Sequence, residues 1–235
     1  MLSVIIPTFN EIESGYLQKS FPLLKNTEGI EVICVDSNST DGTVELINKF
    51  NFKLISVDTT SRAKRLNIGI ENSTGSMILL HHPRSLLCVS AFKTLKNEED
   101  LYWGAFTHRF DLDHPLLRFT SWWSNLWRGD KRGIFYLDHC FYIQREIFEE
   151  VGLMPEVDIF EDTELSKLLN TYCEPLRLDE ISLTSAVRFR KNGVWRQALT
   201  NQILKWKYYF NVDHKVLNKQ YEKETALNAK YESDK

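Results

Sequence analysis

The sequence lacks several features that would assign it to other classes of protein. Its formal net charge is −3 at pH 7, whereas a general nucleic-acid-binding protein would carry a surplus of basic residues. No apolar run is long enough to span a bilayer. The amino terminus opens with a strand pattern and has no basic and apolar secretion signal. A cytoplasmic location is therefore the simplest expectation.

Cysteine is scarce, and two common phosphate-binding motifs are missing. No two cysteines form a Cys-x-x-Cys pair, and three of the four lie in apolar stretches, so we expect small buried side chains and neither disulfides nor a zinc site. No G-x-G-x-x-G follows the first strand pattern, and G-x-x-x-x-G-K-[ST] is absent, which disfavours a dinucleotide site and a P-loop. The cysteines are Cys34, Cys88, Cys140 and Cys173.

What the sequence does contain is an alternation of strand and helix patterns. Hydrophobic residues make up 43% of the 235 residues, enough for one large domain with a sizeable core. The alternation in the first ninety residues predicts a parallel sheet with right-handed crossovers. Strands are expected at 2–6, 30–36, 53–57 and 76–80, with helices at 11–25, 42–50 and 61–72. Later strands are expected at 102–110, 133–143 and 176–187, and helices at 115–127, 145–151, 160–170 and 194–211.

Polar residues follow the first two strands, at the edge where open α/β sheets place their ligands. The second strand ends in Asp36, and an acid there can accept a hydrogen bond from a ribose hydroxyl or a base edge. A local role, in which Asp36 caps the loop that follows, is the alternative. The first strand ends in Pro7-Thr8-Phe9-Asn10-Glu11.

These two segments resemble the start of the family 2 glycosyltransferases, whose first strands hold the nucleotide of a sugar donor. The resemblance implies an α/β fold of the glycosyltransferase A type, with a mainly parallel central sheet flanked by helices. It implies one domain over 1–215, with a donor half (1–97) and an acceptor and catalytic half (98–215), before a polar tail (216–235). The donor-binding residues that it implies here are Pro7, Thr8, Asn10, Glu11 and Asp36.

The helix expected at 61–72 begins with the basic residues Arg62, Lys64 and Arg65. Cations and free amide groups at a helix start suit a diphosphate, although the same pattern, taken alone, is more typical of a solvated basic face. In the family that the sequence resembles, this segment contacts the donor and contains an Asn-x-Gly sequence. The resemblance therefore implies that Arg62 and Asn67 bind the donor.

The fourth strand departs from the family pattern. Family members end this strand in an acidic DXD-type motif that binds Mg²⁺ or Mn²⁺, but here it ends in His81-His82-Pro83-Arg84. Three interpretations are open: Arg84 replaces the metal at the diphosphate, the metal is held by His81 or His82 with a later acid, or the site is inactive. Adjacent strand residues point to opposite faces, so both histidines are not expected to bind one ion. His82 and Arg84 are predicted donor-binding residues.

The strongest candidates for chemistry are Glu161 and Asp162, at the start of the helix expected at 160–170. Helical spacing places both acids near the buried edge of the first turn, where they would also offset the helix dipole. The segment resembles the Glu-Asp motif of inverting family 2 enzymes. That resemblance implies that Asp162 deprotonates the acceptor hydroxyl while it attacks the anomeric carbon.

The second half offers weaker candidates for the acceptor. Asp138 interrupts the strand expected at 133–143, and a buried acid requires a partner or a ligand. A structural acid at the sheet edge is the alternative, and His139 beside it is a further candidate contact. The helix at 194–211 combines aromatic and basic residues, which is typical of core packing, a homodimer contact or peripheral membrane contact.

The resemblance implies an inverting glycosyltransferase that moves one sugar from a nucleotide-diphosphate sugar to an unknown acceptor. The Gln-x-x-Arg-Trp motif of processive synthases is absent. The alternative is a catalytically impaired relative that binds nucleotide or a partner. Four later segments resemble a subgroup associated with radical-SAM or selenium-related gene neighbourhoods; they are 104–110, 114–118, 184–189 and 193–196.

Overall fold

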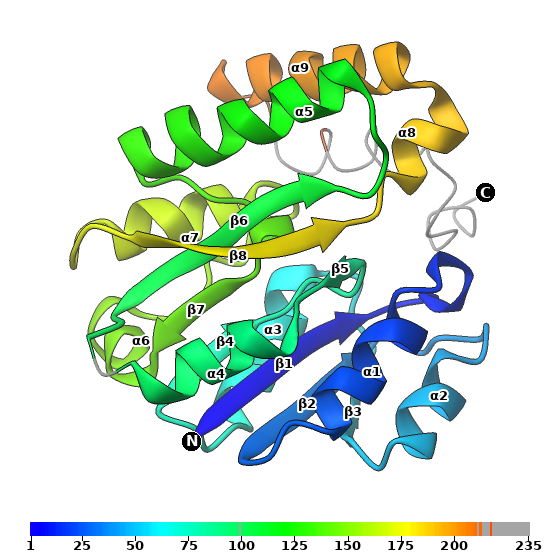
Figure 1. The fold of residues 1–235 in the computed structure, drawn as a ribbon, viewed down its shortest axis with the longest axis vertical. Coiled ribbons are helices and arrows are strands. Elements are labelled where there is room, and N and C mark those ends of the chain that lie inside the picture. Colours follow the sequence, from blue (N-terminus) through cyan, green and yellow to red (C-terminus); the bar gives the residue numbers. More distant parts are fainter. Residues whose placement is uncertain (99, 211, 213–216, 218–235) are drawn as a thin grey trace.

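The computed structural model describes residues 1–98, 100–210, 212 and 217. Within these residues eight strands form one sheet in the order β3-β2-β1-β4-β7-β6-β8-β5 (Figure 1). The predicted tail, 216–235, lies outside the described residues except for Leu217. The strands are β1 (Leu2–Thr8), β2 (Ile30–Asp36), β3 (Lys53–Ser56), β4 (Met77–Leu80), β5 (Ser85–Leu86), β6 (Trp103–Phe110), β7 (Phe141–Gln144) and β8 (Leu176–Thr184).

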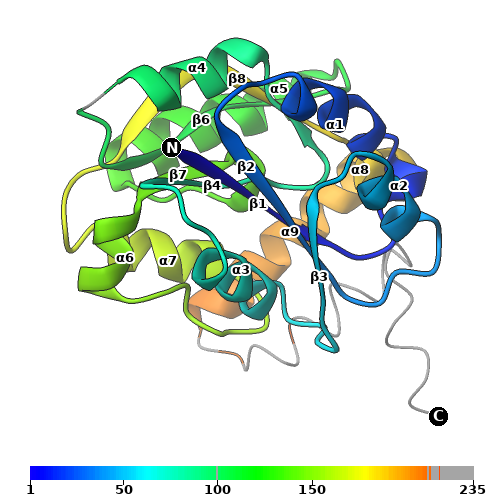
Figure 2. The same ribbon diagram turned by 90° about the horizontal axis from the view of Figure 1, so that it is seen from below.

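Helices cover both faces of the sheet (Figure 2). Short 3-10 segments, η1 (Ile12–Ser14) and η3 (Leu137–His139), and a π-helical segment, η2 (Trp123–Asp130), complete the fold. The α-helices are α1 (Leu17–Lys25), α2 (Thr43–Lys49), α3 (Arg62–Glu71), α4 (Val89–Asn97), α5 (Pro115–Trp122), α6 (Arg145–Val151), α7 (Glu161–Leu169), α8 (Val187–Asn192) and α9 (Val194–Tyr209).

The alternation of side chains along β1 builds two cores. Val4 and Ile6 pack in the cluster that contains Phe21 of α1 and Phe92 of α4. Ile5, on the opposite face, packs in the cluster that contains residues of α3, α6 and α7. Because each face of β1 is fully covered, the strand reads as a continuous apolar run, as parallel strands buried on both faces do.

The strand order reverses direction at β1, which pairs in parallel with β2 on one side and β4 on the other. Loops that leave these strands at the same edge diverge to opposite faces, and the crevice between them is where open α/β sheets bind ligands. The predicted parallel arrangement of the first four strands is confirmed. The second half makes the sheet mixed, because β7 runs antiparallel to both β4 and β6.

The strand predicted at 133–143 is wrong except at its end. Only Phe141–Gln144 forms a strand, and η3 precedes it. The cause is a set of contacts far apart in sequence: the amide of Phe135 donates to Oγ of Ser166 and that of Leu137 donates to Oδ2 of Asp162. Since these amides are satisfied by α7 side chains, no neighbouring strand is required to pair with them.

Other predicted elements differ in extent. The helix at 11–25 is divided by Gly15, whose φ of +68° ends η1 before α1 begins. The segment at 176–187 is one strand that ends at Thr184, followed by α8. The helix at 115–127 is α-helical only to Trp122 and continues as the π-helical η2. The remaining predicted elements are present within a few residues of their expected bounds.

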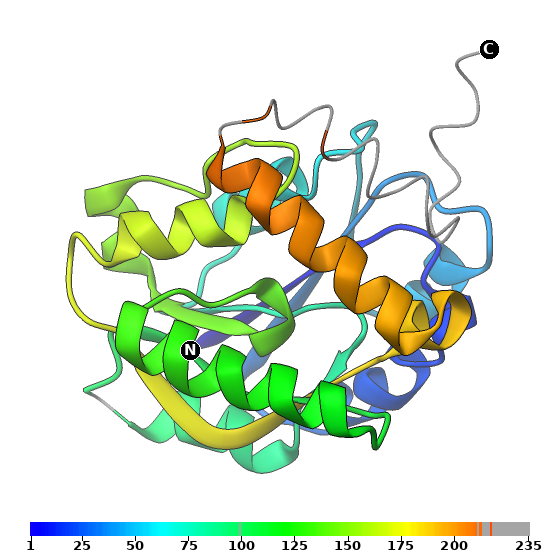
Figure 3. The ribbon, with the colours of Figure 1, turned by 90° about the horizontal axis from the view of Figure 1, so that it is seen from above.

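Two helices close one end of the molecule. Helices α5 and α9 lie together beyond the β6 and β8 end of the sheet, away from the half formed by β1–β3 (Figures 1 and 3). They approach each other near their first residues, where the rings of His114 and Trp195 are 6.2 Å apart. This end of the molecule contributes the second wall of the site described below.

The contact between α3 and the sheet yields a prediction for stability. A Cβ at Gly69 would lie 2.3 Å from Cγ2 of Ile5, so α3 packs on β1 only because residue 69 has no side chain. We expect Gly69→Ala to lower the free energy of unfolding by about 1–3 kcal/mol through overpacking. Urea denaturation measures the change. Glu71→Ala, at an exposed position of the same helix, is the control, and equal stability of the two variants would contradict the packing account.

Candidate active site

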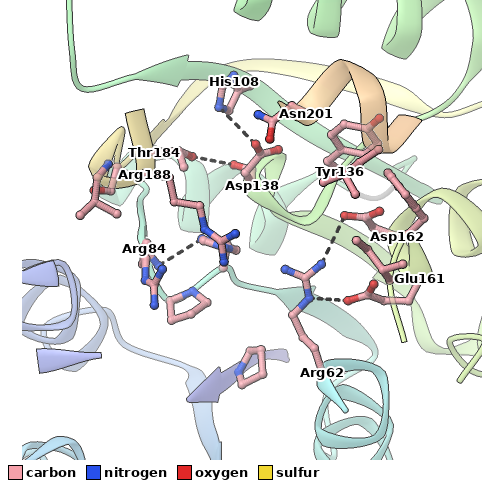
Figure 4. A pocket seen from close by; sticks show the side chains of 18 of the residues that line it. Arg62, Arg84, His108, Tyr136, Asp138, Glu161, Asp162, Thr184, Arg188 and Asn201 are labelled. Atoms are coloured by element: carbon pink, nitrogen blue, oxygen red, sulfur yellow. Dashed lines mark hydrogen bonds and ion pairs between the residues drawn. The ribbon is translucent and has the colours of Figure 1, made fainter. Parts of the chain in front are cut away.

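A cavity of about 340 Å³ lies at the carboxyl ends of β1, β2 and β4 and extends between α5 and α9. The wall from the predicted donor half contains Pro7, near the end of β1, and Ser37 and Thr60, which follow β2 and β3. Its opposite wall contains residues of η3, α7 and α9 (Figure 4). The cavity therefore joins the two predicted halves. Among the predicted site residues, those that line it are Pro7, Glu11, Arg62, His82, Arg84, Asp138, Glu161 and Asp162.

Two of the predicted donor residues form a buried ion pair. Nε of Arg84 lies 2.6 Å from Oε2 of Glu11, and Nη2 lies 3.3 Å from Oε1. Burial raises the pKa of Glu11, and the Arg84 guanidinium opposes part of that effect. The loops after β1 and β4 are thus joined by a two-pronged contact that fixes the plane of the guanidinium.

The two adjacent histidines are placed differently. His82 lines the cavity, and its Nδ1 accepts a hydrogen bond from the amide of Arg84. His81 is fully buried and is not among the lining residues. Burial lowers the pKa of His82 well below its usual range and that of His81 to about 4, so both rings are neutral at pH 7. The two rings therefore lie in different surroundings, and the expectation that they do not bind one ion stays a prediction.

Asp36, Thr8 and Asn10 form a hydrogen-bonded corner beneath the cavity and do not line it. Oδ1 of Asp36 accepts from Oγ1 of Thr8 at 2.8 Å, and Oδ2 accepts from the amide of Ser39 at 2.8 Å. Oδ1 of Asn10 accepts from the amide of Thr40 at 2.9 Å. These side chains hold the loops after β1 and β2 together, which is the local role considered for Asp36.

Asn67 is also structural in its placement. Its Nδ2 donates to the carbonyl of Met154 at 2.9 Å, and its Oδ1 accepts from the Met154 amide at 3.0 Å. The side chain is buried and lies outside the cavity lining. Asn67 therefore ties α3 to the segment that leads into α7.

Glu161 and Asp162 open α7 and are both buried. The preceding residue, Phe160, has a φ of +62°, a left-handed conformation that turns the chain sharply into the helix. Arg62 of α3 donates to Glu161, and its Nη2 lies 3.6 Å from Oδ2 of Asp162 (Figure 4). Oδ2 of Asp162 also accepts from the amide of Leu137 at 3.0 Å. The predicted proximity of both acids to the buried edge is confirmed.

The ionisation of Asp162 is tuned by this setting. Burial and the charge of Glu161 raise the pKa of Asp162 to about 6, against the opposing effect of Arg62. The carboxyl is therefore more basic than that of an ordinary aspartate. This is the range in which a carboxylate serves as a general base near neutral pH.

Asp138 lies in η3 at the entrance to β7, not within a strand. Its Oδ2 lies 3.5 Å from Nε2 of His108. Its carbonyl accepts from the hydroxyls of Ser85, Ser182 and Thr184 at 2.6–3.2 Å. Burial would raise the pKa of Asp138, but the neighbouring histidines and Arg128 outweigh it and lower the pKa to about 2. An ionised acid thus faces the cavity from the acceptor half.

His139 is fully buried behind Asp138 and is not among the lining residues. Its Nδ1 lies 3.0 Å from the carbonyl of Phe106, which can only accept, so Nδ1 carries the proton. Nε2 of the neutral ring then accepts from Oγ of Ser124 at 2.7 Å. His139 therefore supports η3 and η2 from inside.

Among the cavity residues that sequence reasoning did not assign to the site are His108, Arg128, Tyr136 and Lys205. The Arg128 guanidinium lies 3.3 Å from the centre of the Tyr136 ring. Burial and the charge of Arg128 lower the pKa of Lys205 to about 8. The sequence pattern of α5–η2 and of α9 contains a signal for Arg128 and Lys205, because polar residues recur at every fourth position among aromatic ones.

The residues at the end of β4 do not fit a metal site of the acidic type. Arg84 stands where the family pattern has an acid, and its guanidinium is paired with Glu11. Among the described residues, no group of three or more His, Cys, Asp or Glu side chains is placed to hold a metal ion.

The fold and part of the sequence match known proteins. Residues 3–83, about a third of the chain, match Glycosyl transferase family 2. The matched segment contains the loops after β1, β2, β3 and β4 that form the donor-half wall. The fold is a GT-A glycosyltransferase fold. Among curated proteins, no sequence matches the chain.

Solved structures share this fold at low sequence identity. A mannosyltransferase from Pyrobaculum calidifontis, PcManGT, solved with GDP-Man and Mn²⁺, has a TM-score of 0.64 and 17% identity over 97% of this chain and 72% of that chain. S. aureus TarS 1-349 has a TM-score of 0.59 and 18% identity over 79% of this chain. In the complex of TarS 1-349 with UDP-GlcNAc, the TM-score is 0.58 and the identity 19% over 79% of this chain.

The chain spans 58% of the length of TarS 1-349, and 56% in the UDP-GlcNAc complex.

The coupling of the two acids can be tested without a substrate. Because the charge of Glu161 raises the pKa of Asp162, Glu161→Gln is expected to move the titration midpoint of Asp162 from about 6 toward that of an ordinary aspartate. Carboxyl-carbon NMR of Asp162 as a function of pH measures the midpoint. Glu164→Gln, in the same turn but paired with Lys167, is the control and should leave the midpoint unchanged. A midpoint unmoved by Glu161→Gln would contradict the coupling.

Proposed function

We propose that the protein is an inverting glycosyltransferase that moves a single sugar from a nucleotide-diphosphate sugar to an acceptor hydroxyl. One observation carries the proposal. Asp162, a buried carboxyl with a pKa of about 6, opens into the cavity formed by the loops after β1, β2 and β4. In this proposal, the carboxylate that acts as the base faces the wall that binds the nucleotide. The cavity between them is large enough for a bound molecule.

The donor lies along the donor-half wall in this proposal. Pro7, Ser37 and Thr60 contact the nucleoside, while Asp36, Thr8 and Asn10 position the loops that carry them. Arg62 is 35% exposed at its side chain, so the guanidinium presents an edge to the cavity while it holds Glu161. That edge binds the donor diphosphate. GDP-Man and UDP-GlcNAc in the solved relatives support a nucleotide-sugar donor and leave the base open.

Arg84 assists at the leaving group. Its guanidinium is oriented by Glu11, and its backbone amide donates to the His82 ring. A fixed cation beside the bond that breaks stabilises the negative charge that develops on the nucleoside diphosphate. Because its partner is already in place, little reorganisation is required during the reaction.

The acceptor enters from the side of Asp138 and Asp162. Asp162 removes the acceptor proton as the acceptor oxygen bonds to the anomeric carbon, and the bond from that carbon to the phosphate oxygen breaks. The electron pair leaves with the nucleoside diphosphate. Attack opposite the leaving group inverts the anomeric configuration. Asp138, ionised and facing the cavity, accepts a hydrogen bond from another acceptor hydroxyl, and His139 supports it from behind.

A second candidate function follows from the Arg84–Glu11 ion pair. Arg84 stands at the place of the family's acidic motif and is already paired with Glu11, which favours a protein that binds nucleotide without transferring sugar. The two candidates differ in turnover: release of UDP or GDP from sugar donors supports the enzyme, whereas binding without release from every donor supports the second candidate. The resemblance to the subgroup associated with radical-SAM or selenium-related gene neighbourhoods stays a prediction.

Asp162→Asn tests the base. We expect the release of UDP or GDP from the preferred sugar donor to fall by about 10²–10⁴-fold, because the amide cannot accept a proton. The parent rate is expected to rise with pH through about 6, as Asp162 loses its proton. Donor affinity, measured by titration calorimetry, should change little. Glu164→Gln should keep the parent rate, and a full rate in Asp162→Asn would rule out the assignment.

The role of Arg84 is tested by binding. Because a guanidinium takes the place of the acidic motif, UDP or GDP is expected to bind equally well with EDTA or with Mn²⁺. Arg84→Lys keeps the charge but loses the planar fork, so it should weaken diphosphate binding about tenfold. The free nucleoside, which has no phosphate, is the control ligand and should be unaffected. Binding that requires Mn²⁺, or equal losses for both ligands, would contradict the role.

A further inference from the structure

The described part of the chain exposes large apolar side chains mainly on two helices. Eleven of its seventeen exposed large hydrophobic residues lie on α5, η2, α9 and the residue that ends α9. Five of the six tryptophans of the chain are among them. Trp103, the sixth, is buried in the core. Tryptophan is therefore concentrated on the solvent-exposed surface of α5, η2 and α9. Such an exposed apolar surface is typical of a contact surface.

Helix α9 has its polar and apolar sides inverted. Three polar residues spaced four apart, Gln197, Asn201 and Lys205, line the cavity. The opposite side carries large apolar residues that are 43–77% exposed. In water, an amphipathic helix buries its apolar side, so this orientation is unfavourable unless something covers it. The outward residues are Trp195, Leu199, Ile203, Trp206 and Phe210.

The segment α5–η2 repeats the inversion. Thr120, Ser124 and Arg128, again spaced four apart, line the cavity, while the outward side is 39–56% exposed. The outward rings contact one another, with Trp123 and Trp127 centred 5.5 Å apart. The outward residues are Phe119, Trp122, Trp123, Leu126 and Trp127. We call the outward sides of α5, η2 and α9 the aromatic face.

The aromatic face is basic in a chain that is acidic overall. Helix α9 contains no acidic residue, and within 115–132 the single acid is Asp130. The whole chain has a net charge of −3, so positive charge is concentrated at this end of the molecule. The basic residues of the two segments that do not line the cavity are Arg118, Lys131, Arg132, Arg196 and Lys207, of which Arg118 pairs with Asp113.

We propose that the aromatic face binds the surface of an anionic phospholipid bilayer. Tryptophan and tyrosine rings prefer the boundary between headgroups and acyl chains, and lysine and arginine beside them attract anionic lipids. No described helix is long and apolar enough to cross a membrane, so the contact is with one leaflet. The two helices lie at the same end of the molecule (Figure 3), which allows both to meet one plane.

Charge favours the bilayer over a second copy of the chain. A two-fold interface brings the same patch of each copy together, and here that would place basic segments against basic segments. Like charges in such a contact cost binding energy, whereas an anionic lipid surface neutralises them. This inference concerns the outer sides of the helices and does not depend on the proposed sugar transfer.

Vesicle sedimentation tests the proposal. The protein is expected to sediment with vesicles that contain phosphatidylglycerol, to stay in solution with phosphatidylcholine alone, and to dissociate as salt is raised. Arg132→Gln with Arg196→Gln, both exposed and outside the cavity, should lower partitioning about thirtyfold, at about 1 kcal/mol for each charge removed. Trp123→Ser with Trp206→Ser should lower it at least tenfold.

Matched controls separate the surface from general effects. Lys25→Gln with Lys49→Gln removes two exposed charges at the other end of the molecule, and Tyr102→Ser removes an exposed ring away from the aromatic face. Both should sediment like the parent. Sedimentation equilibrium monitors association in solution. The proposal would be overturned if the protein did not bind phosphatidylglycerol vesicles, or if the variants of the aromatic face bound them like the parent. It would also be overturned if the protein did not bind vesicles but formed a dimer that Trp123→Ser with Trp206→Ser dissociates.

Discussion

The contact on which the site depends is the ion pair between Arg62 and Glu161. Arg62 comes from α3 in the predicted donor half, and Glu161 comes from α7 in the predicted acceptor half, ninety-nine residues later. The pair holds the two halves at the fixed separation that defines the cavity. Burial raises the pKa of Asp162, and the charges of Glu161 and Arg62 then act on it in opposite directions, so the same contact adjusts how basic Asp162 is. The spacing across the cavity and the pKa of Asp162 therefore both depend on the contact between Arg62 and Glu161.

The second wall depends on α7 as well. Side chains of α7 satisfy the amides of Phe135 and Leu137, and this bonding shapes the turn that presents Asp138. Cys140 follows with a φ of +57°, a conformation that tertiary contacts must impose on a non-glycine residue. Asp138 of η3 and Asp162 of α7 thus reach the cavity through backbone geometry that neither segment would adopt alone.

The sequence predicted what local periodicity determines. The first four strands and the helix that begins with Glu161 and Asp162 follow from short patterns, and the structure has them within a few residues. The segment 133–143 was mistaken for a strand because its hydrogen-bond partners lie in α7, beyond any local window. Asp36 and Asn67 illustrate a different limit: their residue types suit a ligand, but neighbouring loops take up their hydrogen-bonding capacity.

Other residues of the site were hidden by the aromatic content of their segments. Arg128 and Lys205 are spaced like solvent-facing residues of a helix packed on a core, yet they face the cavity. Only the three-dimensional arrangement shows that both helices turn their polar sides inward. His108 gave no signal, since one histidine in an alternating strand has no pattern to distinguish it.

The π-helical geometry of η2 determines how insertions and deletions alter the cavity wall that contains Arg128. A π-helix closes its hydrogen bonds over five residues, in contrast to the four of an α-helix, so it accommodates extra chain without lengthening the segment in proportion. Loss of one residue there would restore α-helical winding and rotate everything that follows, Arg128 included. Single insertions and deletions in η2 could therefore change the direction of the side chains on this wall while the sheet and the loops after β1 and β2 stay as they are.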